Sequence, residues 1–215
     1  MTEAIDMRSI LPDARDQGAR PTCLAFAVSD AHMLAARRNE LLSPEYLHFH
    51  AARRSGVGLS AGVGVVRIRE ALSVEGQPSE MECPYSDARD ESWVPPSGLT
   101  AIWTRGSRLR NGTPSAVLEA ALLAKRAHVL VLRISRSFHL PDSTSHMIVE
   151  DGGKDGRLHA VLVIGMAPIG DALAFVARNS WGPAWGIEGH AWLPSQYVDS
   201  RAVDIIEIEQ EADQA

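Results

Sequence analysis

Residues 178–186 read Arg-Asn-Ser-Trp-Gly-Pro-Ala-Trp-Gly. Their first residue is the last of a short apolar run, residues 172–178, that predicts a β-strand. The side-chain amide of Asn179 can accept a hydrogen bond from an imidazole and fix its ring and tautomer without adding a buried charge. Trp181 and Trp185 are either core aromatics or, in the case of Trp181, a cover that shields such a bond from water and strengthens it. The stretch therefore predicts a turn that presents an amide beside aromatic rings.

The imidazole that this amide best suits is His159, which lies 20 residues before Asn179 near the start of another predicted strand, residues 158–166. A β-hairpin can close that distance. The turn-forming residues 151–156 precede the strand. Among the seven other histidines, only His146 is a serious rival for the role of base.

Cys23 supplies the thiol. Residues 22–38 carry apolar side chains at helical spacing on one face, and Thr22 can cap the helix, so Cys23 takes the first helical position. Unpaired N–H groups and the dipole of a helix N-terminus lower the pKa of a thiol. A buried cysteine that merely packs is the alternative. Gln17, six residues earlier and followed by Gly18, favours a catalytic thiol, because its side-chain N–H can join the backbone N–H of Cys23 in binding an oxyanion.

Two other histidines, His48 and His50, suggest a metal site at first sight. On a helix, residues i and i+2 do not face each other, and no further cysteine or carboxylate completes a ligand set. We therefore expect neither a metal nor another cofactor.

Length and composition are those of a globular protein. The 215 residues, 45% hydrophobic and 22% charged, can bury a core in one domain or two small lobes. The net charge of −6 argues against nucleic-acid and anionic-membrane partners, and no apolar run approaches the roughly 20 residues that span a bilayer. Without a signal peptide, and with only Cys23 and Cys83, a cytoplasmic location with reduced thiols is expected. Delivery as an effector stays open.

The pattern predicts an α+β protein whose first half is mainly helical and whose second half is mainly β. One domain, 1–215, would hold a helical lobe over about 20–100, a β lobe over about 105–208 and a frayed acidic tail over 209–215. A long connector is expected over 84–114. Helices are expected at 22–38, from Ser43, at 63–75 and at 113–127; strands are expected at 128–134, 158–166, 172–178, 188–193 and 203–208.

Together these motifs resemble the papain-like (C1) cysteine peptidases. The resemblance runs from Asp6 to about Asp199, and its Leu-Ser-Pro segment is most similar to the compact bacterial branch of the family. The matching stretches are residues 16–18, 23–27, 42–47, 83–85, 159–161 and 178–186.

The resemblance implies a papain-like two-lobe fold, with a helical left lobe, a β-barrel-like right lobe and the active site in the cleft between them. It implies Cys23 as nucleophile, His159 as general acid/base, Asn179 as its orienter, and Gln17 with the Cys23 N–H as oxyanion hole. The activity would be hydrolysis of peptide bonds in a protein or peptide substrate through an acyl-enzyme. An amidase or peptide ligase with a dedicated substrate, and a non-catalytic peptide-binding module, are the alternatives. The intact set of four residues argues against the last.

The chain departs from the family where substrates bind. Residues 20–22 are Arg-Pro-Thr, where members often have Cys-Gly-Ser, so the disulfide of secreted members is absent, and Leu24 replaces a tryptophan. Arg157 and Leu158 precede the histidine where many bacterial members have small residues. We expect Arg157 to narrow or charge the pocket for the second residue before the scissile bond, favouring an acidic side chain; a merely solvated Arg157 is the alternative. The candidate substrate-binding residues are Gly62 of the weak Gly-rich loop 60–64, Arg157, Leu158 and Trp185.

The resemblance begins almost at Met1. We therefore expect no inhibitory propeptide. Control would come from a restricted substrate, a separate inhibitor or regulatory partner, or removal of an upstream segment.

Overall fold

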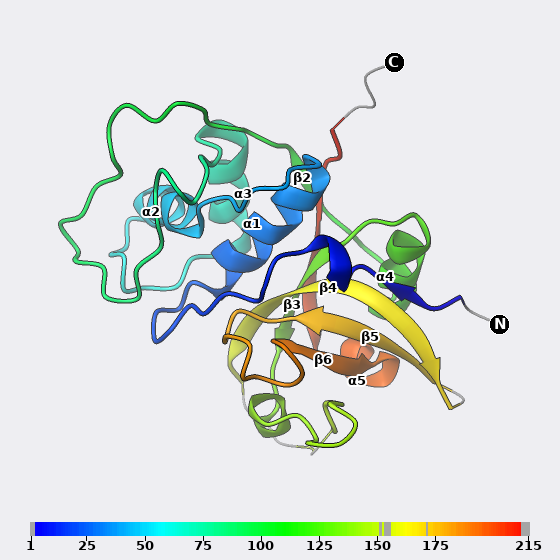
Figure 1. Cartoon of the computed structure of the whole chain (residues 1–215). Coiled ribbons are helices and arrows are strands. Elements are labelled where there is room, and N and C mark those ends of the chain that lie inside the picture. Colours follow the sequence, from blue (N-terminus) through cyan, green and yellow to red (C-terminus); the bar gives the residue numbers. More distant parts are fainter. Residues whose placement is uncertain (1–2, 151, 153–155, 171, 212–215) are drawn as a thin grey trace. The chain divides into compact units, whose positions relative to one another are not determined.

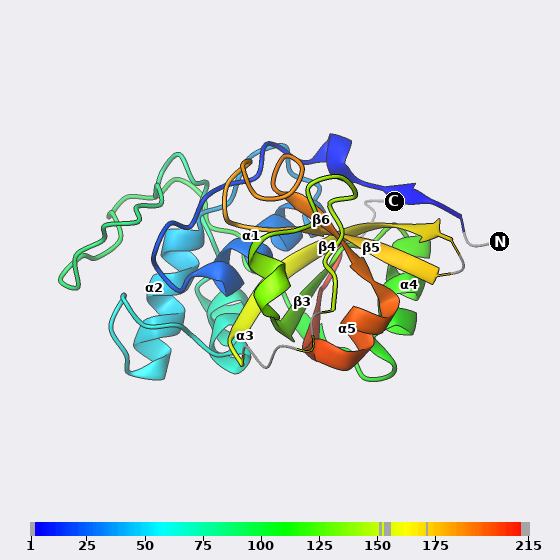
Figure 2. The same ribbon diagram turned by 90° about the horizontal axis from the view of Figure 1, so that it is seen from below.

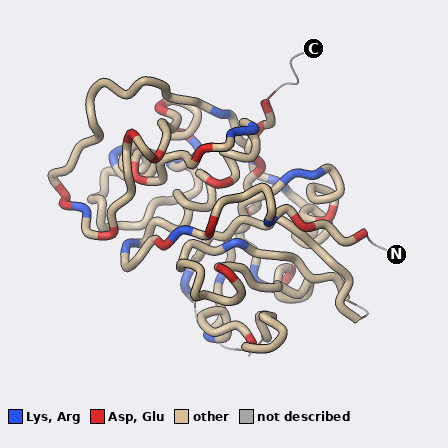
Figure 3. Tube along the Cα trace, viewed as in Figure 1, with Lys and Arg blue, Asp and Glu red and all other residues tan. Residues whose placement is uncertain are grey.

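The computed structural model describes residues 3–150, 152, 156–170 and 172–211. The chain divides into two compact units (Figure 1). Residues 17–108 and 208–215 form one, the helical unit, and residues 1–16 and 109–207 form the other, the β unit. Acidic and basic residues are interspersed along both units (Figure 3), so neither trace carries a long block of one sign.

The helical unit is built from α1 (Cys23–Ala35), α2 (Pro44–Ser55) and α3 (Val65–Val74), which pack against one another. In α1 every residue from Leu24 to Met33 is buried, so the helix is enclosed on all faces rather than along the single apolar stripe that the sequence predicts. Its polar residues are accommodated by hydrogen bonds, among them His32 Nδ1 to Gln77 Oε1 at 2.9 Å.

The ends of these helices agree with the sequence in one case and not in another. Ser43 caps α2 as predicted, since its Oγ accepts from the Tyr46 N–H at 3.0 Å and Pro44 takes the first helical position. Thr22 occupies the N-cap position of α1, but its side chain makes no capping bond. Its hydroxyl is instead 2.9 Å from the Tyr85 hydroxyl, which ties the start of α1 to the segment after Cys83.

The β unit contains an antiparallel sheet in the order β2-β7-β3-β4-β5-β6, with β1 paired to β4. The path does not close over the described residues. Where the sequence predicts a barrel-like lobe, the structure therefore has an open sheet. The strands are β1 Ile5–Asp6, β2 Ser107–Leu109, β3 His128–Arg133, β4 Leu158–Ile169, β5 Ala172–Arg178, β6 His190–Pro194 and β7 Ala202–Ile208.

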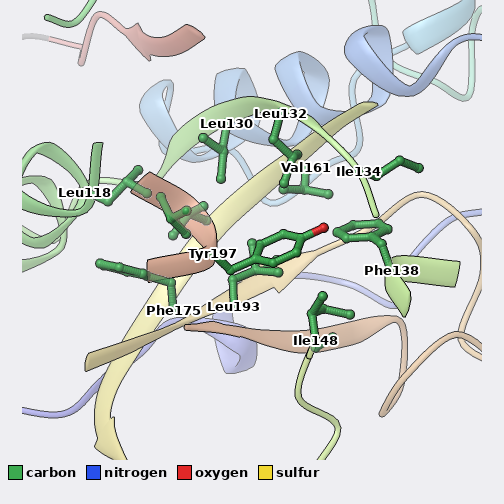
Figure 4. Packing of buried hydrophobic residues seen from close by; sticks show 14 of the residues in the cluster. Leu118, Leu130, Leu132, Ile134, Phe138, Ile148, Val161, Phe175, Leu193 and Tyr197 are labelled. Carbon is green, nitrogen blue, oxygen red and sulfur yellow. The ribbon is translucent and has the colours of Figure 1, made fainter. Parts of the chain in front are cut away.

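Helices α4 (Pro114–Leu123) and α5 (Ser195–Arg201) pack against each other and against this sheet (Figure 2). The sequence pattern did not predict α5. Its Tyr197 is fully buried in the apolar cluster of the β unit beside Phe138 (Figure 4), and its hydroxyl bonds to Ser135 Oγ at 2.9 Å. That one side chain anchors both α5 and the short 3₁₀ helix η2 (Arg136–His139) to the core.

Residues 84–106 form no helix or strand, as expected for a connector, and a second short 3₁₀ helix, η1, covers Arg8–Ile10. The expected frayed tail begins later than predicted, because Glu209 N donates to Gly106 O at 3.0 Å and Glu211 N to Ala35 O at 2.9 Å. Residues 212–215, and most of the predicted turn 151–156, lie outside the described residues. In the part of the chain that the structure describes, no helix has the length and apolarity to cross a bilayer.

Buried neutral histidines predict that the protein loses stability in mild acid. Burial lowers the pKa of His32 and of His159 to about 4, and it also lowers the pKa of His48, His128 and His190. Between about pH 6.5 and pH 4 the unfolded chain binds protons that the folded chain does not, so the free energy of unfolding falls as the pH falls. Urea unfolding at several pH values in this range measures the slope of the free energy of unfolding against pH.

The variant His32→Gln checks the origin of that slope. It removes one titrating group, so the slope should shrink by about 1.4 kcal/mol per pH unit in this range. Identical slopes for the variant and the wild type would show that His32 does not contribute.

Candidate active site

The candidate residues of the β unit are His159 and Asn179, which are hydrogen-bonded. His159 is the second residue of β4 and Asn179 directly follows β5. The two strands are antiparallel neighbours, with Leu162 opposite Arg178, which brings the two side chains together. His159 Nε2 lies 2.7 Å from Asn179 Oδ1, and both residues are buried. The rival, His146, lies in the loop before β4, where the structure gives it no bond to Asn179.

The partners of Asn179 determine the tautomer of His159. Asn179 Oδ1 also accepts the Ser180 N–H, at 2.8 Å, so the amide oxygen faces both groups. An oxygen can only accept, so His159 Nε2 must carry a hydrogen. The neutral ring therefore has its lone pair on Nδ1, which is the atom that can take a proton from another group.

Aromatic rings surround this imidazole. The Trp181 ring lies 4.6 Å from the His159 ring at 41°, and the Phe138 ring lies 5.5 Å away in an edge-on arrangement. His139 stacks on Trp181 at 5.1 Å with the rings almost parallel, at 10°. Apolar surroundings strengthen the hydrogen bond between His159 and Asn179 because they exclude competing water.

The N-terminal segment holds the turn that carries Asn179 and Trp181. Asp16 bridges Trp181, and Gly182 N donates to Arg15 O at 3.1 Å. Gly189, with a φ of 80°, packs so closely that a Cβ there would collide with Ala14. Glycine is required at this position both by the positive φ and by that approach.

Three effects act on the pKa of His159. Burial disfavours the charged ring and lowers the pKa to about 4, whereas the hydrogen bond to Asn179 raises it and the neighbouring His139 lowers it further. Burial is the largest of the three. Near neutral pH the His159 imidazole is therefore uncharged and able to act as a base.

The candidate residues of the helical unit are Cys23 and Gln17. Cys23 is the first residue of α1 and is partly exposed. Gln17 is 5% exposed, and its Nε2 donates to the carbonyl oxygen of Arg20 at 2.6 Å. Gly18 makes the intervening turn with a φ of 58°, where a Cβ would meet the side chain of Asp87. Gln17 is thus held in one orientation within the loop that leads into α1.

The two cysteines differ in environment. Neither takes part in a disulfide, but Cys83 is fully buried and its pKa is raised, chiefly by that burial. A raised pKa leaves less of the reactive thiolate. Cys23 is the thiol that a reagent in solution can reach.

The expected substrate-binding residues fall into two groups. Arg157 is exposed, Leu158 is 54% exposed, and Gly62 is exposed close to Pro21, so all three are accessible. Trp185 is not, because it is 6% exposed, belongs to the core of the β unit and donates its indole N–H to Phe138 O at 3.0 Å. The assignment of Trp185 to substrate binding is therefore corrected to a structural role.

The histidines that suggested a metal site have other contacts. His48 Nε2 is 3.1 Å from Leu59 O, and the His50 ring packs on Tyr46 and Phe49. Among the described residues, no group of three or more His, Cys, Asp or Glu side chains could hold a metal ion.

Sequence reasoning missed several contacts around the candidate residues of each unit. Phe138 and His139 carried no recognisable signal, because a short 3₁₀ helix brings them to the imidazole. Tyr85 lies in the matching stretch 83–85, yet its role shows only in the structure, where its hydroxyl donates to Gln17 O at 2.7 Å. Arg20 stood out in the sequence only as a departure from the family.

Comparisons with known proteins show the family of the chain. Residues 1–204 match the family model described as papain family cysteine protease. Cysteine proteinase 3 of Dictyostelium discoideum is 25% identical over 182 residues, which cover 82% of this chain and 53% of that protein. Cathepsin K of Mus musculus is 27% identical over 198 residues, which cover 89% of this chain and 59% of that protein. The chain thus spans little more than half the length of these relatives.

Solved structures share the fold. Xylellain, a cysteine protease from Xylella fastidiosa, has a TM-score of 0.78 at 21% identity, over 97% of this chain and 86% of that one. The Carica candamarcensis cysteine protease CMS1MS2, solved in complex with E-64, has a TM-score of 0.75 at 16% identity, over 99% of this chain and all of that one. The predicted papain-like fold is confirmed.

The bond between His159 and Asn179 predicts opposite pKa changes in two variants. Asn179→Ala removes the acceptor that stabilises the protonated ring, so the pKa of His159 should fall below its value of about 4. Asn179→Asp places a negative charge beside the ring and should raise it. Titration of the imidazole by NMR measures both, with His32 as an internal control that should not move. Equal pKa values of His159 in the two variants would contradict the assigned pairing.

Proposed function

Because the chain belongs to the papain family of cysteine proteases, we propose that it is a cysteine endopeptidase that cleaves protein or peptide substrates through an acyl-enzyme on Cys23. The observation that supports this most is the 2.7 Å bond between His159 Nε2 and Asn179 Oδ1, because it leaves Nδ1 of a buried, neutral imidazole as a base.

In the proposed first stage, His159 Nδ1 takes the proton of the Cys23 thiol and the sulfur attacks the carbonyl carbon of the scissile bond. The carbonyl oxygen becomes anionic and is bound by the Cys23 backbone N–H and by Gln17 Nε2. The intermediate collapses when the imidazolium returns its proton to the leaving nitrogen, which breaks the C–N bond and releases the amine. The acyl group stays on sulfur as a thioester.

In the second stage, water attacks the thioester while His159 Nδ1 takes one of its protons. The C–S bond then breaks, the acid is released and the proton returns to sulfur, so the enzyme is regenerated. Losing one oxyanion donor typically costs about 100- to 1000-fold in rate. Gln17 and the backbone of Cys23 therefore carry a share of catalysis comparable to that of the base.

Labelling with an epoxysuccinyl reagent such as E-64 tests this function. The wild type should label near neutral pH, and Cys23→Ala should not label at all. His159→Ala should label far more slowly, and hydrolysis of a peptide substrate should fall by about 10⁴-fold or more in both variants. Intact-mass spectrometry and a fluorogenic peptide assay measure the two effects.

The second cysteine provides the matched control. Cys83→Ala should label and cleave like the wild type. Failure of the wild type to label, or labelling that persists in Cys23→Ala and disappears in Cys83→Ala, would overturn the proposed function.

We further propose that Arg157 favours an acidic side chain at the second residue before the scissile bond. The exposed guanidinium lies two residues before the proposed base, and it is chemically complementary to a carboxylate. In a peptide library, Arg157→Ala should lower kcat/KM for Asp or Glu at that position by about 5- to 30-fold, with little change for neutral residues. An unchanged preference would show that Arg157 is only a solvated surface residue.

A further inference from the structure

A buried ion pair lies directly behind the loop that carries Gln17 and Cys23. Arg20 and Glu45 face each other in a two-pronged arrangement, with Nη1 to Oε2 at 2.7 Å and Nη2 to Oε1 at 3.0 Å. Their side chains are 7% and 0% exposed. Glu45 lies in the first turn of α2, where a carboxylate is favoured by the helix dipole.

The same two side chains bind the connector that follows Cys83. Arg20 Nη1 donates to Ser86 O at 2.6 Å, and Ser86 N donates to Glu45 Oε2 at 3.1 Å. Arg89 forms a second ion pair with Glu45 at 3.4 Å. One guanidinium and one carboxylate thus join three segments that are far apart in the sequence, namely the loop 17–22, α2 and the connector.

The backbone of Arg20 is the link to the candidate oxyanion hole. Its carbonyl oxygen accepts the Gln17 Nε2 hydrogen at 2.6 Å and the Thr22 N–H at 2.8 Å. Tyr85 closes the loop from the other side, because its hydroxyl donates to Gln17 O at 2.7 Å and lies 2.9 Å from Thr22 Oγ1. The position of the Gln17 amide therefore depends on where the backbone of Arg20 is held.

We propose that Arg20 is a positioning residue for the proposed reaction: its buried pair with Glu45 fixes the Arg20 carbonyl, and that carbonyl orients the Gln17 amide as oxyanion donor. Arg20 acts through Gln17 and does not touch the substrate. The proposal rests on the proposed function, because an oxyanion donor has a role only in acyl transfer.

Arginine is required here for a geometric reason. A planar guanidinium can bind both carboxylate oxygens and a carbonyl at once, whereas the ammonium of lysine is a single point of charge on a flexible stem. Arg20→Lys keeps the charge that Glu45 needs but not the two-pronged geometry. It is therefore a better probe than Arg20→Met, which leaves a buried carboxylate without its main partner and is expected to fold poorly.

The helical unit contains a matched control pair. Arg54 binds Glu75 in the same two-pronged manner, with distances of 2.9 and 2.6 Å, and it joins α2 to the residue after α3. In the part of the chain that the structure describes, the side chains of Arg54 and Glu75 bind each other and not the loop 17–22. Arg54→Lys therefore reports the general cost of weakening an ion pair in this unit.

The experiment compares peptide hydrolysis by Arg20→Lys, Arg54→Lys and the wild type, after E-64 labelling has shown that the wild type is active. Arg20→Lys should lower kcat by about 10- to 100-fold with little change in KM, because a displaced oxyanion donor weakens the transition state and not substrate binding. Alkylation of Cys23 by iodoacetamide needs no oxyanion donor, so its rate should be unchanged. Arg54→Lys should behave like the wild type in both assays.

A double-mutant cycle shows whether Arg20 acts through Gln17. Gln17→Ala removes the donor, so adding Arg20→Lys to it should lower kcat by less than about twofold further. Full additivity of the two losses would overturn the proposal, as would an unchanged kcat in Arg20→Lys or an equal loss in Arg54→Lys. A wild type that fails to label with E-64 overturns the proposed function instead, so the two failures are distinguishable.

Discussion

Burying a polar or charged group costs several kcal/mol unless another group pairs with it. This constraint acts on the candidate residues of each unit. His159 is buried and neutral beside Asn179, and the carbonyl of Arg20 is occupied by Gln17 and Thr22. The pairing fixes orientations that exposed side chains would not keep. His159 and Gln17 are therefore each held by a buried partner, Asn179 and Arg20 respectively.

The β unit and the helical unit orient their buried side chains by different means. In the β unit the register of β4 and β5 aligns His159 with Asn179, so backbone pairing places the side chains. In the helical unit, side chains join the loop before α1 to α2 and to the connector. These side-chain hydrogen bonds and the ion pair are needed there because the loop 17–22 has no regular backbone hydrogen-bonding pattern of its own.

Much of this could be predicted from the sequence, since local patterns carry local structure. The apolar runs predict β4 and β5, and the spacing of His159 and Asn179 predicts a hairpin between them. The Ser43-Pro44 pair predicts the start of α2. The structure shows all of these. The predicted capping hydrogen bond of Thr22 was wrong, because its hydroxyl bonds to the Tyr85 hydroxyl and not to the backbone of α1. The Arg20–Glu45 pair could not be predicted, because the two residues are 25 positions apart and no local sequence pattern indicates which distant charge a side chain will pair with.

The pairing of the N-terminal segment has a consequence for biosynthesis. Ile5 lies opposite Met166, and Arg15 and Asp16 bind the turn that begins at Asn179. Residues 5–16 are thus made long before the residues that pair with them, and contacts of such long range form slowly. Cys23 is likewise made before His159 and Asn179. A nascent chain therefore carries the accessible thiol long before it carries the hydrogen-bonded pair of imidazole and amide.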